Sequence, residues 1–206
     1  PTGAVILMYH SVANHEVAQY IDPPNHLPSA EFEMQMAFLS RERNVVSLNE
    51  LVAQLEAGQE PCAGTVCITF DDGYLDNLTV AAPILEKYRL PATLYLPTSY
   101  IDCGETHWAD TVHQMFLFRT RDQLTMPSLG FSANLADEMQ RASAYRKLHR
   151  PLLTSLYPDR QALLAEVREQ LRPSQEGPRL TMNWDEVCDL GQRFPLFTVG
   201  GHSQNH

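Results

Sequence analysis

Short apolar segments alternate with helix-like segments in this chain of 206 residues, and no other feature constrains its fold as strongly. Apolar runs of about five residues are typical of buried strands, whereas apolar residues at helical spacing indicate helices. The expected strands are residues 4–9, 44–48, 65–70, 92–96 and 195–200. The expected helices are residues 29–42, 48–57 and 75–89. This alternation predicts the parallel sheet of an α/β protein.

The first of these helices, at 29–42, shows how the pattern separates core from surface. Phe32, Met36 and Leu39 recur at helical spacing, so we expect them in the core. Ser29 stands where an N-cap would begin the helix.

A longer stretch, residues 100–183, separates the fourth expected strand from the fifth. Its spaced apolar residues predict a mostly helical insertion. We hypothesise that this insertion covers one side of the functional face and narrows the range of substrates.

Two adjacent carboxylates, Asp71 and Asp72, follow the third expected strand. Neighbouring acids repel each other and resist desolvation, so a metal, a cation or a shared proton usually compensates them. Both can reach one site only if the backbone turns, which Gly73 allows. A solvated Asp-Asp-Gly turn is the alternative. Aspartyl-phosphate phosphatases also place acids after a strand, but two positions apart rather than adjacent.

The fifth expected strand ends in glycines and leads to His202 and His206. Imidazole and carboxylate together suit zinc or a similar divalent ion. One Asp and two His would leave positions open for water, as in catalytic zinc sites. Two histidines four positions apart also arise by chance, so a pair of exposed imidazoles at a strand end is the alternative.

These candidate residues all follow the carboxyl ends of expected strands, the edge at which α/β proteins place their sites. His10 follows the first strand in the same way. For His10 alone, the sequence is equally consistent with a hydrogen-bonded histidine near the core and with a pocket residue.

With residues 69–73 and 202–206 in this order, the chain resembles the polysaccharide deacetylase family, carbohydrate esterase family four. That family removes acetyl groups from N-acetylated or O-acetylated sugars. Residues 6–12 and 182–187 are also similar to family segments and support the resemblance. The likeness thus extends to both ends of the chain.

The resemblance implies a role for each motif residue. Asp71 would be the general base, and Asp72, His202 and His206 would bind the metal, expected to be zinc, with cobalt or nickel as alternatives. The metal would polarise the acetyl carbonyl and hold the attacking water, while Asp71 takes the water's proton. We assign His10 to substrate binding.

The resemblance also implies a distorted (β/α) barrel. Five strands are too few to close an eight-stranded barrel. We therefore expect residues 1–206 to form one deacetylase-like catalytic domain, an incomplete or distorted barrel truncated at its C-terminus, with the helical insertion at 100–183 inside it. Relatives carry an Arg-containing motif and a Leu-x-His that supplies the general acid, and both would lie beyond His206.

The expected function is metal-dependent removal of acetyl groups from an N-acetylated amino-sugar polysaccharide or oligosaccharide. An O-acetyl esterase and an inactive, metal-retaining carbohydrate-binding or structural module are the alternatives. The formal net charge of -10 argues against nucleic-acid binding, and we find no apolar run long enough to span a membrane. The four cysteines show no CxxC spacing and indicate neither a zinc ribbon nor a disulfide framework.

Overall fold

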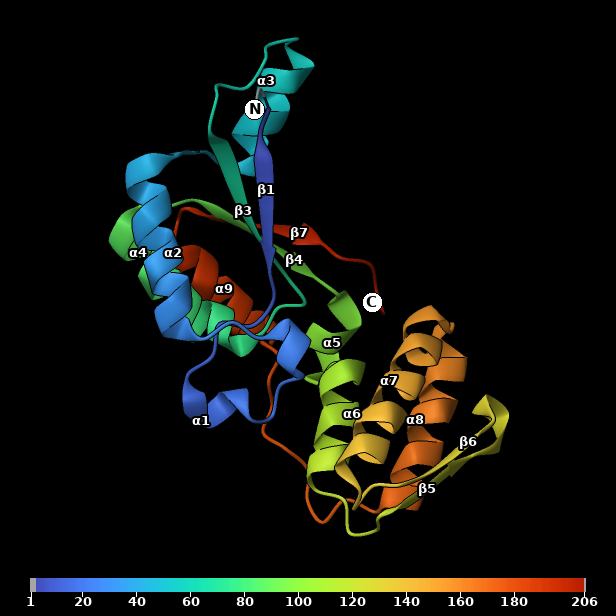
Figure 1. The fold of residues 1–206 in the computed structure, drawn as a ribbon. Coiled ribbons are helices and arrows are strands. Elements are labelled where there is room, and N and C mark those ends of the chain that lie inside the picture. Colours follow the sequence, from blue (N-terminus) through green and yellow to red (C-terminus); the bar gives the residue numbers. More distant parts are fainter. Residues whose placement is uncertain (1–2, 206) are drawn as a thin grey trace. The chain divides into compact units, whose positions relative to one another are not determined.

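The computed structural model describes residues 3–205, which divide into two compact units (Figure 1). The sheet unit comprises residues 3–19, 23–106 and 179–205. The helical unit comprises residues 20–22 and 107–178. No helix within the described part of the chain is long and apolar enough to cross a membrane.

A parallel sheet organises the sheet unit, as the alternation of segments predicted. Its strands are β1 (Val5–Tyr9), β2 (Asn44–Val45), β3 (Thr65–Asp71), β4 (Ala92–Leu96) and β7 (Phe197–Gly201). They run in the order β1-β3-β4-β7, and β2 pairs with the start of β3. Between residues 3 and 205 this sheet is open, so the barrel remains a prediction.

The expected strand at 44–48 is shorter than predicted because a helix begins directly after it. Ser47 caps α3 (Leu48–Glu56): its hydroxyl accepts from the Glu50 N–H at 3.2 Å, while Glu50 accepts from the Ser47 N–H at 2.8 Å. This capping box satisfies donors at the helix start. The chain therefore leaves the sheet after Val45.

Helices α2, α4 and α9 lie on the same side of the sheet (Figure 1). The helical elements of this unit are α1 (His15–Ala18), η1 (Pro23–Asn25), α2 (Ser29–Glu42), α3, the π-helix η2 (Asn77–Ala81), α4 (Ala82–Tyr88), α5 (Thr98–Cys103) and α9 (Trp184–Arg193). The prediction that Phe32, Met36 and Leu39 lie in the core is confirmed. The predicted Ser29 cap is wrong: Pro28 is the N-cap, and the Ser29 hydroxyl instead donates to Asn14 at 3.0 Å.

The helical unit has its own apolar core. It contains α6 (Trp108–Leu117), β5 (Gln123–Met126), η3 (Pro127–Leu129), β6 (Phe131–Asn134), α7 (Glu138–Thr154) and α8 (Tyr157–Leu171). The stretch that we predicted to be mostly helical also contains β5 and β6, which pair as an antiparallel hairpin that was not predicted. Leu124 and Met126 alternate with exposed residues there, a period of two that favours a strand.

Residues 20–22 join the helical unit through buried hydrogen bonds. The Asp22 N–H donates to Asp110 Oδ1 at 2.7 Å, and the Tyr145 hydroxyl donates to Asp22 Oδ1 at 2.8 Å. Burial raises the pKa of the Asp22 carboxyl, and the Tyr145 hydrogen bond opposes this rise.

Candidate active site

Strand β3 brings the two acids to the carboxyl edge of the sheet. Its residues 65–70 are all buried, since β1 pairs on one side and β4 continues the sheet. Asp71 is the last residue of β3, half-buried, and stands in register with Tyr95 of β4. Because this strand is buried along its length, it fixes the position of the carboxylates that follow it at the carboxyl edge of the sheet.

The backbone turns sharply at Asp72 and Gly73. Both adopt the left-handed conformation, with φ of 72° and 65°. A Cβ on Gly73 would lie 2.6 Å from the end of the Leu96 side chain and 3.0 Å from that of Ile101, so another residue would strain the backbone and force these side chains to move. The sequence assigned this turn to Gly73 alone, whereas Asp72 takes part in it, as Asp tolerates this conformation better than most residues.

A neighbouring segment fixes the turn. The Met182 N–H donates to the Gly73 carbonyl at 2.9 Å, and the Leu75 N–H donates to the Leu180 carbonyl at 2.7 Å. Asp72 itself is only 3% exposed. A buried carboxylate on so constrained a turn is held in one orientation.

His202 reaches the same carboxylate from β7. Its N–H donates to the Leu96 carbonyl at 2.9 Å, which continues the pairing of β7 with β4. The His202 imidazole Nε2 lies 3.8 Å from Asp72 Oδ1. The structure thus brings together two of the three predicted metal ligands, residues 72 and 202, which are 130 positions apart in the sequence.

His10, which directly follows β1, also lies beside the Asp72 carboxylate. Its Nε2 lies 3.9 Å from Asp72 Oδ2, so each oxygen of Asp72 faces a different imidazole. The sequence left open whether His10 is a core histidine or a pocket residue. Its side chain is 22% exposed and lies beside the predicted site.

A buried network holds the loop that carries His10. Asp76 accepts hydrogen bonds from the Ser11 hydroxyl at 2.6 Å and the Val12 N–H at 2.9 Å. The Asn77 side-chain amide donates to the His10 carbonyl at 2.8 Å and to Asp76 at 3.2 Å. Burial raises the pKa of Asp76 to about 6, and these hydrogen bonds oppose the rise.

Asp76 and Asn77 were missed by the sequence reasoning, which included them in a helix at 75–89. Two polar residues directly after the Asp-Asp-Gly run were the available signal. That signal is weak, because polar residues in a helix usually face solvent.

The donors at Asp72 and His202 fit a divalent ion such as zinc. A buried carboxylate oxygen and an imidazole nitrogen are ordinary zinc ligands. The predicted third ligand, His206, lies outside the described residues. Among residues 3–205, no three His, Cys, Asp or Glu side chains form a group that could hold a metal ion. The metal and its ligand set therefore remain predictions.

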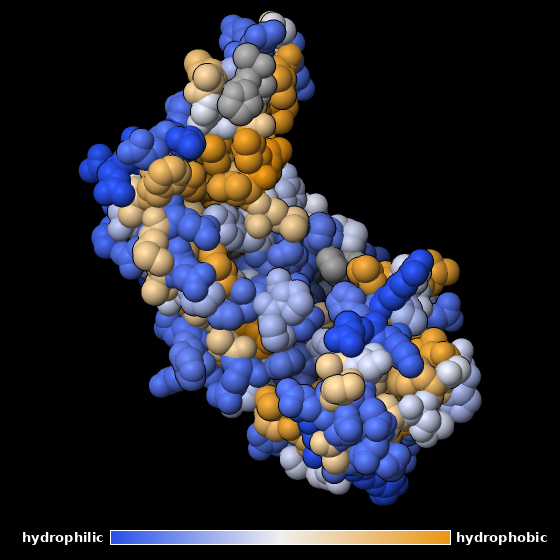
Figure 2. Space-filling view, in the orientation of Figure 1, coloured by the Kyte–Doolittle hydropathy of each residue, from blue (hydrophilic) through white to orange (hydrophobic). Residues whose placement is uncertain are grey.

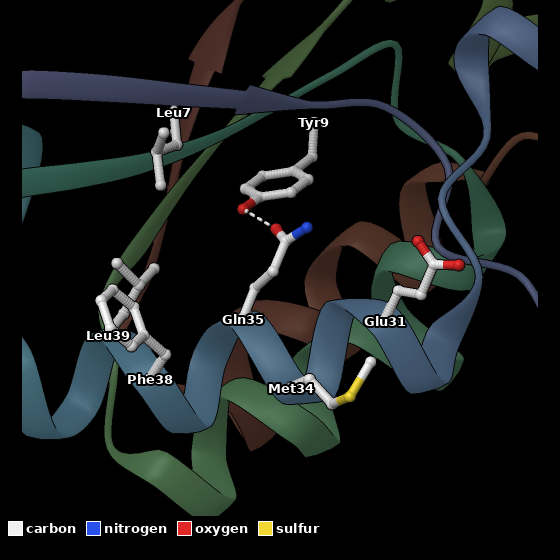
Figure 3. Close-up of a pocket in the computed structure, with 7 residues that line it drawn as sticks. All are labelled: Leu7, Tyr9, Glu31, Met34, Gln35, Phe38 and Leu39. Carbon is white, nitrogen blue, oxygen red and sulfur yellow. Dashed lines mark hydrogen bonds between the residues drawn. The ribbon is translucent and has the colours of Figure 1, made fainter.

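A pocket of about 520 Å³ lies elsewhere in the sheet unit, between β1 and α2 (Figure 3). Within it the Tyr9 hydroxyl donates to Gln35 Oε1 at 2.7 Å. Figure 2 shows apolar surface along β1, where Val5, Ile6 and Met8 are at least half exposed. None of the predicted site residues lines this pocket.

Comparison with known proteins shows what this chain is similar to. Residues 58–141, which include Asp71 and Asp72, match the family described as polysaccharide deacetylase. YxkH of Bacillus subtilis (strain 168), named as a polysaccharide deacetylase, is 34% identical over 97 residues. The chain therefore resembles the polysaccharide deacetylases. The predicted resemblance, and with it the prediction of an enzyme family, is confirmed.

Solved structures of this kind share the fold. IcaB from Ammonifex degensii matches 98% of this chain and 53% of its own, with a TM-score of 0.53 and 15% identity. A de-N-acetylase from Aggregatibacter actinomycetemcomitans matches 97% of this chain and 54% of its own, with a TM-score of 0.51 and 17% identity. The chain thus spans about half the length of these two proteins. Its match with YxkH covers 47% of this chain and 32% of YxkH.

Proposed function

We propose that this chain belongs to the catalytic part of a hydrolase that removes acetyl groups from an N-acetylated amino-sugar polysaccharide or oligosaccharide. One observation carries the proposal: buried Asp72 lies between His202 and His10, at 3.8 and 3.9 Å, directly after Asp71 at the carboxyl edge of the sheet. The relation to polysaccharide deacetylases supports the acetylated glycan as substrate. One protein with the same fold is a de-N-acetylase by name, which favours an amide over an ester.

Asp71 is the general base of this proposal. Hydrolysis adds water to the acetyl carbon, so a base must take one proton from that water. Asp71 is half-buried at the end of β3, and the following turn directs Asp72 into the buried site. In this proposal, Asp71 can therefore act as the base while Asp72 binds the metal.

Asp72 and His202 hold the divalent ion in this proposal, with His206 as the expected third ligand. When bound, such an ion polarises the acetyl carbonyl and eases loss of a proton from water. Zinc suits the combination of carboxylate and imidazole ligands, and cobalt or nickel are alternatives.

His10 donates the proton that the amine needs as it leaves. The C–N bond breaks with its electron pair on nitrogen, which must then gain a proton. Imidazole is the side chain best suited to donate near neutral pH. His10 Nε2 lies beside Asp72, which makes this residue the available acid in the described part of the site. The sequence predicted only substrate binding for His10 and assigned the general acid to the Leu-x-His of the relatives, so this role is a new part of the proposal.

Acetate release by the full-length protein tests the proposal. The substrates are N-acetylated chitooligosaccharides and O-acetylated xylo-oligosaccharides, each assayed after chelation and after zinc is restored. We expect zinc-dependent acetate release from the N-acetylated substrate. Activity on the ester alone would assign an O-acetyl esterase. Zinc binding without acetate release from either substrate would favour the inactive module.

A further inference from the structure

The segment from Asp71 to Asn77 does more than carry the two predicted catalytic acids. Four residues after Asp72, the Asp76 carboxylate is 8% exposed, and the next residue, Asn77, is fully buried. Buried polar groups of this kind are normally fixed by hydrogen bonds. Here three of the side-chain hydrogen bonds reach one short loop, residues 10–12, and a fourth joins Asn77 to Asp76.

We propose that Asp76 and Asn77 are positioning residues that place the His10 imidazole beside Asp72. This inference rests on the proposed function, because the position matters only if His10 takes part in deacetylation. Asp76 binds the loop on the C-terminal side of His10, through the Ser11 hydroxyl and the Val12 N–H. Asn77 binds the His10 carbonyl itself.

The arrangement joins both sides of the site to one segment. Asp72 and Asp76 are close in sequence, whereas His10 comes from a different strand. The β1–β3 register sets Tyr9 opposite Phe70, so the two strands deliver His10 and Asp71 to the same level of the sheet edge. Beyond that level β1 no longer pairs with β3: Ser11 bridges to His26 through the backbone, and the bonds from Asp76 and Asn77 hold the His10 loop on the side of the predicted site.

The local helix geometry supports this reading. Asn77 begins the π-helix η2, a distortion that proteins often place next to functional sites. Burial raises the pKa of the Asp76 carboxyl to about 6, and its three hydrogen bonds oppose this rise only in part. Asp76 stays buried nevertheless.

A mutant series in the full-length protein tests the proposal. Asp76→Ala removes the acceptor for Ser11 and Val12, and Asn77→Ala removes the donor to His10. Asp76→Asn keeps an acceptor for Val12 and, because a serine hydroxyl can also accept, a partner for Ser11. Thr79→Ala is the control: it lies in the same π-helix, but its hydroxyl donates to Leu75 rather than to the His10 loop.

We expect Asp76→Ala and Asn77→Ala to lower kcat by about 10- to 100-fold with KM changed less than about twofold, as for other residues that orient catalytic groups. Asp76→Asn should recover most of the loss, and Thr79→Ala should match the wild type. In a His10→Ala background, Asp76→Ala should cost nothing further, because residues acting through one another are not additive. A full additional loss in that background would overturn the proposal.

A structural measurement keeps this inference separate from the proposed function. The imidazole ¹⁵N signals of His10 report its surroundings directly, in wild type and in folded Asp76→Ala and Asn77→Ala. Shifted His10 signals with no acetate release by the wild type would support the positioning role and contradict the proposed function. Unchanged His10 signals in both alanine variants would overturn the positioning role whatever the activity.

Discussion

His202 Nε2 lies 3.8 Å from Asp72 Oδ1, although the two residues follow β7 and β3, strands that do not pair with each other. Strand β4 lies between β3 and β7 and pairs with both, which brings the ends of the outer two strands to one edge. The approach is therefore a consequence of sheet order and not of sequence proximity.

Replacing His202 with Ala should weaken zinc binding and acetate release together. Since removal of groups that merely orient metal ligands costs about 10- to 100-fold in metal affinity or activity, loss of a ligand should cost at least about 100-fold. Zinc titration and kcat/KM for chitooligosaccharides measure the two effects. His15→Ala, a histidine on α1, is the matched control. Unchanged zinc affinity in His202→Ala would contradict its assignment as a ligand.

Gly73→Ala should lower the free energy of unfolding by about 2–4 kcal/mol, because the new Cβ is both strained and overpacked. It would meet Leu96 at 2.6 Å with φ at +65°. Gly58→Ala separates the two causes: its φ is +71°, but nothing lies within 4 Å, so we expect a loss of about 1–2 kcal/mol. Urea unfolding measures both. Equal losses would show that the contact with Leu96 is relieved at no cost.

Asp76 should make stability fall as pH rises. Its pKa is about 6 in the folded protein, above the ordinary 3.8, so the folded state holds the proton more tightly. The free energy of unfolding is highest below about pH 4. It falls by up to about 3 kcal/mol as pH rises through about 6, because the pKa of Asp76 in the folded protein lies about two pH units above its ordinary value. Urea unfolding at pH 4, 5, 6 and 7 should show this slope in the wild type and a smaller one in Asp76→Asn. Identical slopes would refute the assignment.

In the helical unit, Tyr145→Phe should destabilise the protein by about 1–3 kcal/mol, because it removes the hydroxyl that donates to the buried Asp22. Thermal unfolding measures the loss. Tyr157→Phe, at the start of α8, is the control and should change stability by less than about 0.5 kcal/mol. A Tyr145→Phe variant as stable as the control would show that Asp22 finds another partner.

Much of the sheet was predictable from sequence, because buried parallel strands such as 65–71 and 92–96 are continuous apolar runs. The core positions Phe32 and Met36 followed from helical spacing in the same way. The hairpin at 123–134 was not predicted, since four-residue strands give too short an alternation to stand out against the helices around them.

The candidate site was predictable only in part. The proximity of Asp72 and His202 could be expected because both follow strand ends, a rule that depends on topology alone, while their role as ligands stays a prediction. The contact of His10 with Asp72, and the roles of Asp76 and Asn77, depend on how a loop folds back over the sheet edge. No periodicity in the sequence encodes a contact of that kind.

The proposed deacetylation depends most directly on Asp71 as the base that takes a proton from water. The decisive measurement is kcat for acetate release from N-acetylated chitooligosaccharides by full-length wild type and Asp71→Asn, both saturated with zinc. Asp102→Asn, an exposed acid that accepts the Trp184 indole N–H, is the control. The account predicts that Asp71→Asn lowers kcat by at least about 100-fold, the scale of general base catalysis, while zinc affinity and the control stay unchanged. An Asp71→Asn variant with wild-type kcat would contradict it.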